Sequence, residues 1–73
     1  MTPASVMHRV ESYRDRAATH RHAARNWEAI AGEKPEHRAY YLTLAETQRT
    51  LMRACVEAAV LLEIATLALG AAS

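Results

Sequence analysis

Residues 54–72, ACVEAAVLLEIATLALGAA, form the most apolar stretch of this 73-residue chain. At helical spacing, the apolar residues of this stretch fall on two sides of one helix. One side comprises Cys55, Ala58, Leu62, Ala65 and Leu69. The other side, which we call the outer stripe, lies about half a turn away and comprises Val56, Val60, Ile64 and Leu67. A helix with two apolar sides needs two partners, and we expect the second to be another molecule.

The same stretch is long enough to cross a bilayer, but Glu57 and Glu63 interrupt it. Each carboxylate at mid-membrane costs about 2.5–3.5 kcal/mol on insertion scales, so we expect no membrane span. His8, Arg9 and Glu11 interrupt the N-terminal segment, which therefore does not resemble a secretory signal. Cys55 is the single cysteine, which suits a reducing compartment, and the sequence predicts a cytoplasmic protein. Arginine outnumbers lysine eight to one, a bias typical of a high-GC bacterial or phage genome.

The first half of the chain predicts one helix over about residues 3–31. Thr2 followed by Pro3 is typical of a helix start, and Gly32 is typical of a stop. Between these signals, one stripe alternates by four and three residues, a pattern typical of coiled coils. This stripe comprises Val6, Val10, Tyr13, Ala17, His20, Ala24, Trp27 and Ala31.

Residues 32–34 predict a short loop, and Pro35 predicts the start of a second helix that continues to about residue 69, before Gly70. The predicted inner stripe of this helix shows the same alternation. It comprises His37, Tyr41, Leu44, Gln48, Leu51, Cys55, Ala58, Leu62, Ala65 and Leu69.

A short loop makes the two predicted helices antiparallel neighbours. Folding the chain about residue 34 pairs the two stripes residue by residue, for example Trp27 with Tyr41. The one wholly polar interior layer pairs His20 with Gln48, and it should fix the register, because a slip would bury both groups without partners. The sequence therefore predicts an all-α fold, a coiled-coil-like antiparallel two-helix hairpin in a single domain over residues 1–73.

A core of this size supplies only about 3–5 kcal/mol of net stability. We therefore expect the hairpin to dimerise into a four-helix bundle through the outer stripe, as a two-fold homodimer.

Catalytic chemistry finds little support in the sequence. Metal sites of helical bundles place carboxylates inward, and neither predicted stripe contains Asp or Glu. His8, Glu11 and Asp15 share one face of the first helix and suit only an adventitious or intermolecular ion. Cys55 is expected in an apolar layer beside Tyr13, where a thiol is inert. We predict no enzyme activity, metal site, cofactor or small-molecule substrate.

The leading functional prediction is a small non-enzymatic protein–protein interaction module: a regulator, inhibitor or adaptor that acts on another protein as a homodimer. A dimeric RNA- or DNA-binding regulator is the alternative, because the first helix carries arginines that can face phosphates or an acidic partner. These are Arg9, Arg14, Arg16, Arg21 and Arg25. The favoured interpretation is that they flank the stripe and pair with carboxylates such as Glu11 or Glu28. A small assembly or scaffold protein is a second alternative, if the outer stripe joins copies head to tail.

Overall fold

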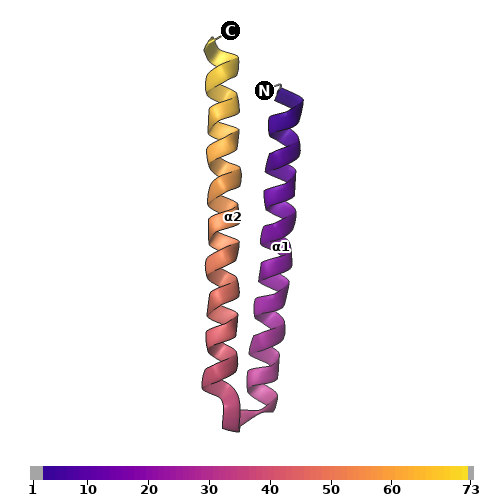
Figure 1. The fold of residues 1–73 in the computed structure, drawn as a ribbon, viewed down its shortest axis with the longest axis vertical. Helices are drawn as coiled ribbons and strands as arrows, with labels where there is room; N and C mark the ends of the chain where they lie inside the picture. The colour runs from indigo at the N-terminus through magenta and orange to yellow at the C-terminus, as the bar shows by residue number, and fades with distance from the viewer. Residues whose placement is uncertain (1–2, 73) are drawn as a thin grey trace.

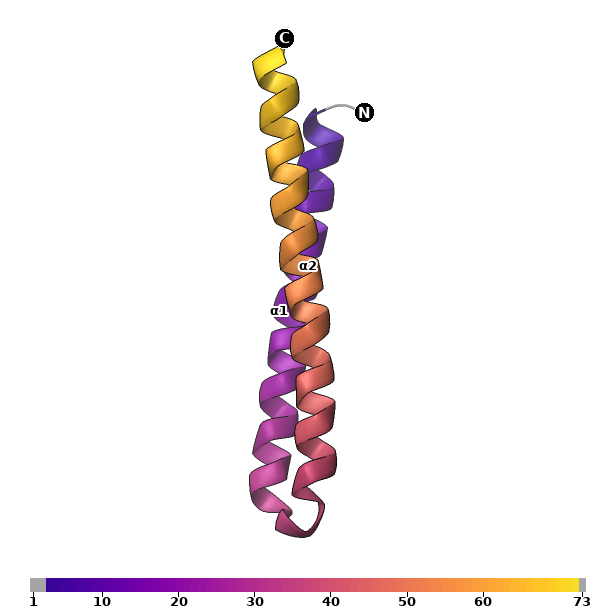
Figure 2. The same ribbon diagram turned by 90° about the vertical axis from the view of Figure 1, so that its left-hand side faces the viewer.

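The computed structural model describes residues 3–72 and shows an all-helical hairpin (Figure 1). Helix α1 spans Pro3–Glu33, a single 3-10 turn η1 spans Pro35–His37, and helix α2 spans Arg38–Ala72. The two helices lie side by side in both views, and α2 extends past the start of α1 (Figure 1, Figure 2). The hairpin is a thin rod of 58 × 14 × 13 Å. The predicted antiparallel helix pair is confirmed, whereas the N-cap predicted at Thr2 lies outside the described residues.

The helix ends differ from the prediction by a few residues. Gly32 and Gly70 both lie inside helices without a positive φ, so the predicted stops at residues 31 and 69 are wrong. Glycine near an open helix end costs only about 1 kcal/mol, which the helix tolerates. A residue before proline avoids the helical region of φ and ψ, and Lys34 accordingly separates α1 from the next element. Pro35 then begins η1, and α2 begins only at Arg38. The turn is closed by the His37 N–H, which donates to the Lys34 carbonyl at 3.0 Å.

Two contacts between α1 and α2 show in which register the helices pack. The Trp27 and Tyr41 rings stack with centroids 5.7 Å apart, and His20 Nδ1 lies 2.7 Å from Gln48 Oε1. Each pair is symmetric about Lys34, at seven and fourteen residues to either side. The helices therefore pack in the register obtained by folding the chain about residue 34.

The stripe predicted for α1 faces α2 throughout. Its buried members are Val6, Val10, Ala17, Ala24 and Ala31. Tyr13, His20 and Trp27, which complete the stripe, are half-buried.

The stripe predicted for α2 is correct only at alternate positions. Ala45 and Ala59 are buried, whereas Leu51 and Leu69 are 43% and 64% exposed. The observed inner stripe comprises Tyr41, Ala45, Gln48, Met52, Cys55, Ala59, Leu62 and Thr66. At the other positions the predicted residue, Leu44, Leu51, Ala58 or Ala65, directly precedes the one that lies in the stripe. The prediction is also wrong for His37 and Leu69, which are exposed.

Periodicity alone does not decide between Leu44 and Ala45, or between Ala58 and Ala59, because both members of each pair are apolar. The smaller Ala45 lies inside in the first pair, the second pair offers no difference in size, and at residues 65 and 66 the larger Thr66 lies inside. Thr66 is tolerated at the half-buried end of the stripe because its hydroxyl donates to the Leu62 carbonyl at 2.8 Å.

Alanine dominates the fully buried side chains of the contact between the helices, and larger members of the two stripes are half-buried. Seven apolar side chains are buried among the residues whose burial is described, and five of them are alanines; the other two are Val6 and Val10. Each alanine removes only a methyl group from water, and a buried CH₂ contributes about 0.8 kcal/mol. The helix pair is therefore close-packed but buries little apolar area.

Replacing Ala59 with leucine should destabilise the hairpin by about 1–3 kcal/mol, because Ala59 is 1% exposed and a larger side chain overpacks a buried position. The same substitution at Ala18, which is exposed in the middle of α1, should change stability by less than about 0.5 kcal/mol. Urea unfolding followed by circular dichroism at 222 nm measures both. Equal midpoints for the two variants would contradict the observed inner stripe.

We propose that the His20–Gln48 layer fixes the register. Gln48→Leu alone should cost about 1–3 kcal/mol, because it leaves His20 half-buried without its partner. The double variant His20→Leu/Gln48→Leu should keep or raise the melting temperature while broadening its NMR amide resonances, since leucines permit more than one register. A double variant that fails to fold would argue against this role.

Candidate interaction surfaces of the hairpin

The outer stripe is uncovered in the hairpin. Its members Val56, Val60, Ile64 and Leu67 are 41%, 43%, 57% and 74% exposed. Because the inner stripe is rotated from its predicted position, the outer stripe lies about a third of a turn from it, rather than half a turn. The outer stripe continues onto α1 at Met7, which shares a surface hollow with Glu63, Thr66 and Leu67.

Two ion pairs cross between the helices along the side that carries the outer stripe. Arg14 of α1 pairs with Glu63 of α2, and Glu28 of α1 pairs with Arg49 of α2. All four side chains are at least a third exposed or close to it, and exposed pairs contribute only about 0–1 kcal/mol each. They therefore form a polar border to the outer stripe and add little to stability.

A second uncovered apolar surface runs along the other flank of α2, about a third of a turn from the inner stripe. We call it the lateral stripe, and it alternates by four and three residues along the helix. It comprises Tyr40, Leu44, Thr47, Leu51, Ala54, Ala58, Leu61, Ala65 and Ala68. Tyr40, Leu51 and Leu61 are 63%, 43% and 58% exposed, and Leu44 and Ala58 are half-buried. No member of the stripe is charged.

The sequence prediction missed the lateral stripe because it assigned four of its members to the helix contact. The signal was present as an unbroken alternation from Tyr40 to Ala68, in which Thr47 is the one polar residue. Three stripes at thirds of a turn leave α2 apolar on most of its surface near the C-terminal end. Periodicity does not say which of three such stripes meets α1.

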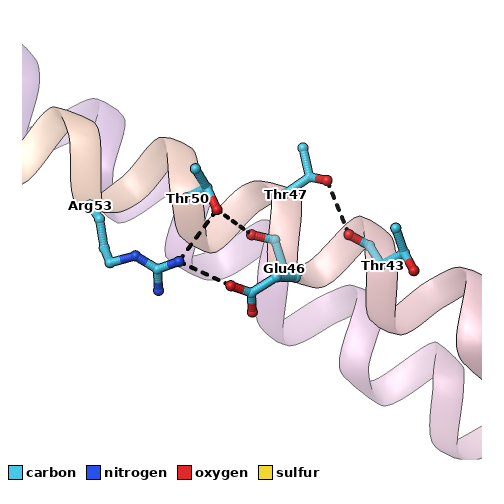
Figure 3. A network of polar contacts seen from close by, with 5 residues as sticks. All are labelled: Thr43, Glu46, Thr47, Thr50 and Arg53. Atoms are coloured by element: carbon cyan, nitrogen blue, oxygen red, sulfur yellow. Dashed lines mark hydrogen bonds and ion pairs between the residues drawn. The ribbon is translucent and has the colours of Figure 1, made fainter.

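In the half of α2 nearest the turn, where Leu42 is 40% exposed, a network of polar side chains lies beside the lateral stripe and includes its member Thr47 (Figure 3). The hydroxyls of Thr43, Thr47 and Thr50 each donate to the carbonyl four residues earlier, at 2.9–3.1 Å. Arg53 donates to Glu46 Oε1 at 3.0 Å and to Thr50 Oγ1 at 3.3 Å. These groups satisfy one another on α2 itself, so this half of the helix presents a polar outer face while the other half presents Val56 to Leu67.

The arginines of α1 are divided between its two flanks. By helical spacing Arg9 and Arg16 lie on the flank of the lateral stripe, and Arg14, Arg21 and Arg25 lie on the flank of the outer stripe. The Arg16 guanidinium carbon lies 5.5 Å from the centroid of the Tyr13 ring. The predicted flanking arrangement is therefore present in part, but the ion pairs run between the helices: Arg14 pairs with Glu63, and Glu28 pairs with Arg49.

A surface hollow runs along the flank of α1 that carries Arg16, and it is lined by His8, Glu11, Ser12, Asp15, Arg16, Thr19 and His20. Among the described residues, no three His, Cys, Asp or Glu side chains lie close enough together to hold a metal ion. Neither helix, over the part of the chain that is described, has an apolar stretch of the length needed to span a bilayer. We assign no metal ligand to the hairpin.

The protein is therefore a thin hairpin in which α1 covers the inner stripe of α2 and leaves the outer and lateral stripes uncovered. Comparison of the chain with protein-family models, with curated protein sequences and with solved structures finds no match.

Proposed function

We propose that this protein is a non-enzymatic protein–protein interaction module that works as a dimer of helical hairpins. The observation that supports the proposal is the contrast between the covered and uncovered apolar surface. Five of the seven buried side chains are alanines, whereas nine of the ten large apolar side chains that are exposed belong to α2. A small domain with so slight a core gains the stability it lacks when association covers such side chains.

Helix-face recognition is the mode of binding that this shape suits. A rigid helix with apolar residues at three- and four-residue spacing binds another helix through that face. The polar network of Thr43, Glu46, Thr50 and Arg53 keeps the rest of α2 in water. The function would then be that of a regulator, inhibitor or adaptor whose target is another protein, with one apolar stripe used for self-association and the other free for the target.

An RNA- or DNA-binding regulator is the second candidate. Arg9, Arg21 and Arg25 are exposed, and none of them pairs with a carboxylate within the described part of the chain. The division of the arginines between two flanks counts against it, because a backbone-tracking surface needs cations along one side. The ion pair with Glu63 also neutralises Arg14, one of the three arginines on the flank of the outer stripe.

Self-association is tested by sedimentation equilibrium of the full chain, with melting temperatures measured in parallel. We expect a dimer of about twice the 8.1 kDa chain mass and a melting temperature that rises with protein concentration, because association stabilises the folded state. A mass of one chain at all concentrations would rule out the proposed function. A mass that keeps increasing with concentration would favour the scaffold alternative.

Nucleic-acid binding is tested by fluorescence anisotropy with labelled duplex RNA and duplex DNA at about 50 and 200 mM salt. We expect no binding beyond the level of a matched-charge control protein. Binding that falls at least about tenfold between these salt concentrations, and falls further in Arg14→Ala/Arg21→Ala, would establish the alternative instead. Ala18→Leu serves as a control variant on the same helix.

A further inference from the structure

We infer that the dimer forms through the lateral stripe, with α2 of one copy antiparallel to α2 of a second copy. This inference specifies the interface left open by the proposed function and rests on it. The lateral stripe competes with the outer stripe for this role, and its size pattern, its length and its lack of charge decide between them.

The lateral stripe is self-complementary in side-chain size. Its large members Tyr40, Leu44 and Leu51 lie toward the turn, and Leu61 is the one large member in the other half, where Ala58, Ala65 and Ala68 are small and where Leu61 falls, within one residue, at the level of Thr47 of a second copy. When a second copy is turned end over end about residues 54 and 55, each of these large residues of one copy becomes level with a small residue of the other.

The pairing can be followed along the stripe. Leu51 is level with Ala58 of the second copy, and Leu44 is level with Ala65, because each pair is symmetric about the same point. Within one residue, Tyr40 meets Ala68. Interdigitation of large with small side chains is what close packing between helices requires. A parallel pair would instead set Leu51 against Leu51 and Ala58 against Ala58, and the alanine layer would leave a void.

The point of symmetry coincides with the middle of the helix. Helix α2 spans Arg38–Ala72, and its midpoint is residue 55, so the two copies overlap along their whole length. The lateral stripe is about 42 Å long, whereas the outer stripe is about 17 Å long. A stable dimer buries about 800 Å² from each partner, which a full-length helix contact approaches and a contact of three turns does not.

Charge also favours the lateral stripe. None of its members is charged, although Glu57 lies beside it, next to Leu61 on the helix surface. Thr47 is its one polar member besides the Tyr40 hydroxyl, and its own hydroxyl already donates to the Thr43 carbonyl at 3.0 Å. The outer stripe adjoins Glu63, and a two-fold contact there would press two Arg14–Glu63 pairs against apolar side chains, with the cost of removing them from water.

The arginines of α1 on this flank, Arg9 and Arg16, are exposed, and the two-fold brings Arg9 of one copy near the level of Arg16 of the other. Such exposed like charges are screened by solvent and salt, so their repulsion is small beside the apolar contact. The dimer also leaves both outer stripes uncovered, where each can bind a target protein.

The interface is tested by sedimentation of the full chain carrying a glutamate in one stripe or the other. Leu51 and Val60 are both 43% exposed on α2, so Leu51→Glu and Val60→Glu form a matched pair. We expect Leu51→Glu to be monomeric at concentrations where the wild type is a dimer, and Val60→Glu to remain a dimer. Circular dichroism at 222 nm should show the same helix content for both variants and the wild type.

A dimeric Leu51→Glu together with a monomeric Val60→Glu would overturn the inference and move the interface to the outer stripe, while leaving the proposed function intact. A monomeric wild type would overturn the proposed function itself. These two failures are therefore distinguishable.

The antiparallel register is tested by exchanging the sizes of two residues. Leu51→Ala and Ala58→Leu should each weaken the dimer by about tenfold or more, the first by leaving a void and the second by overpacking. The double variant Leu51→Ala/Ala58→Leu should recover the wild-type dissociation constant to within about threefold, because the new leucine of one copy then meets the new alanine of the other. A double variant that dimerises no better than the weaker single variant would exclude the antiparallel pairing.

Discussion

The close contact between α1 and α2 over buried alanine side chains is the constraint on which the rest of the structure depends. Ala24 and Ala59 are 0% and 1% exposed, and the helices approach each other where such small side chains meet. Small side chains at a helix contact allow dense packing but remove little apolar surface from water. Tyr41, Met52 and Leu62 are half-buried at the contact, whereas Leu51, Leu61, Ile64 and Leu67 of α2 lie outside it.

Two contacts show which residues of α1 and α2 lie level with each other. Lys34 and η1 form the whole connection between the two helices. In the Trp27–Tyr41 stack and the His20–Gln48 hydrogen bond, residues that are equidistant from Lys34 lie side by side. With this register set, the rotation of α2 about its own axis decides what is inside. Alternate positions of the inner stripe, such as Ala45 and Ala59, lie one residue later than predicted, which is about 100° of helix rotation at each. Averaged over the whole stripe, α2 is rotated by about 50° from its predicted orientation, and this rotation leaves the lateral stripe uncovered.

The division of α2 into three apolar stripes supports the proposed interaction function. The inner stripe is used within the hairpin, and the other two have no partner within the described residues. Polar groups mark their limits: the threonine, glutamate and arginine side chains of Figure 3 on the outward face of α2, and the Arg14–Glu63 pair beside the outer stripe. An apolar surface bounded in this way suits binding to other helices, and the uneven sizes along the lateral stripe suit a second copy of the same chain.

The sequence by itself determined the two helices, the antiparallel hairpin, its register about residue 34 and the stripe of α1, because heptad periodicity and a proline-marked turn are local signals. It also determined that Val56, Val60, Ile64 and Leu67 lie together on one side of α2. Only the tertiary structure decided which of two adjacent apolar residues faces α1 at each turn of α2, since Leu44 and Ala45 satisfy the periodicity equally well. That choice depends on how closely two backbones can approach, which is a property of the packed pair and not of either helix alone. The lateral stripe follows from the tertiary structure for the same reason, because the periodicity alone places two of its leucines, Leu44 and Leu51, in the helix contact.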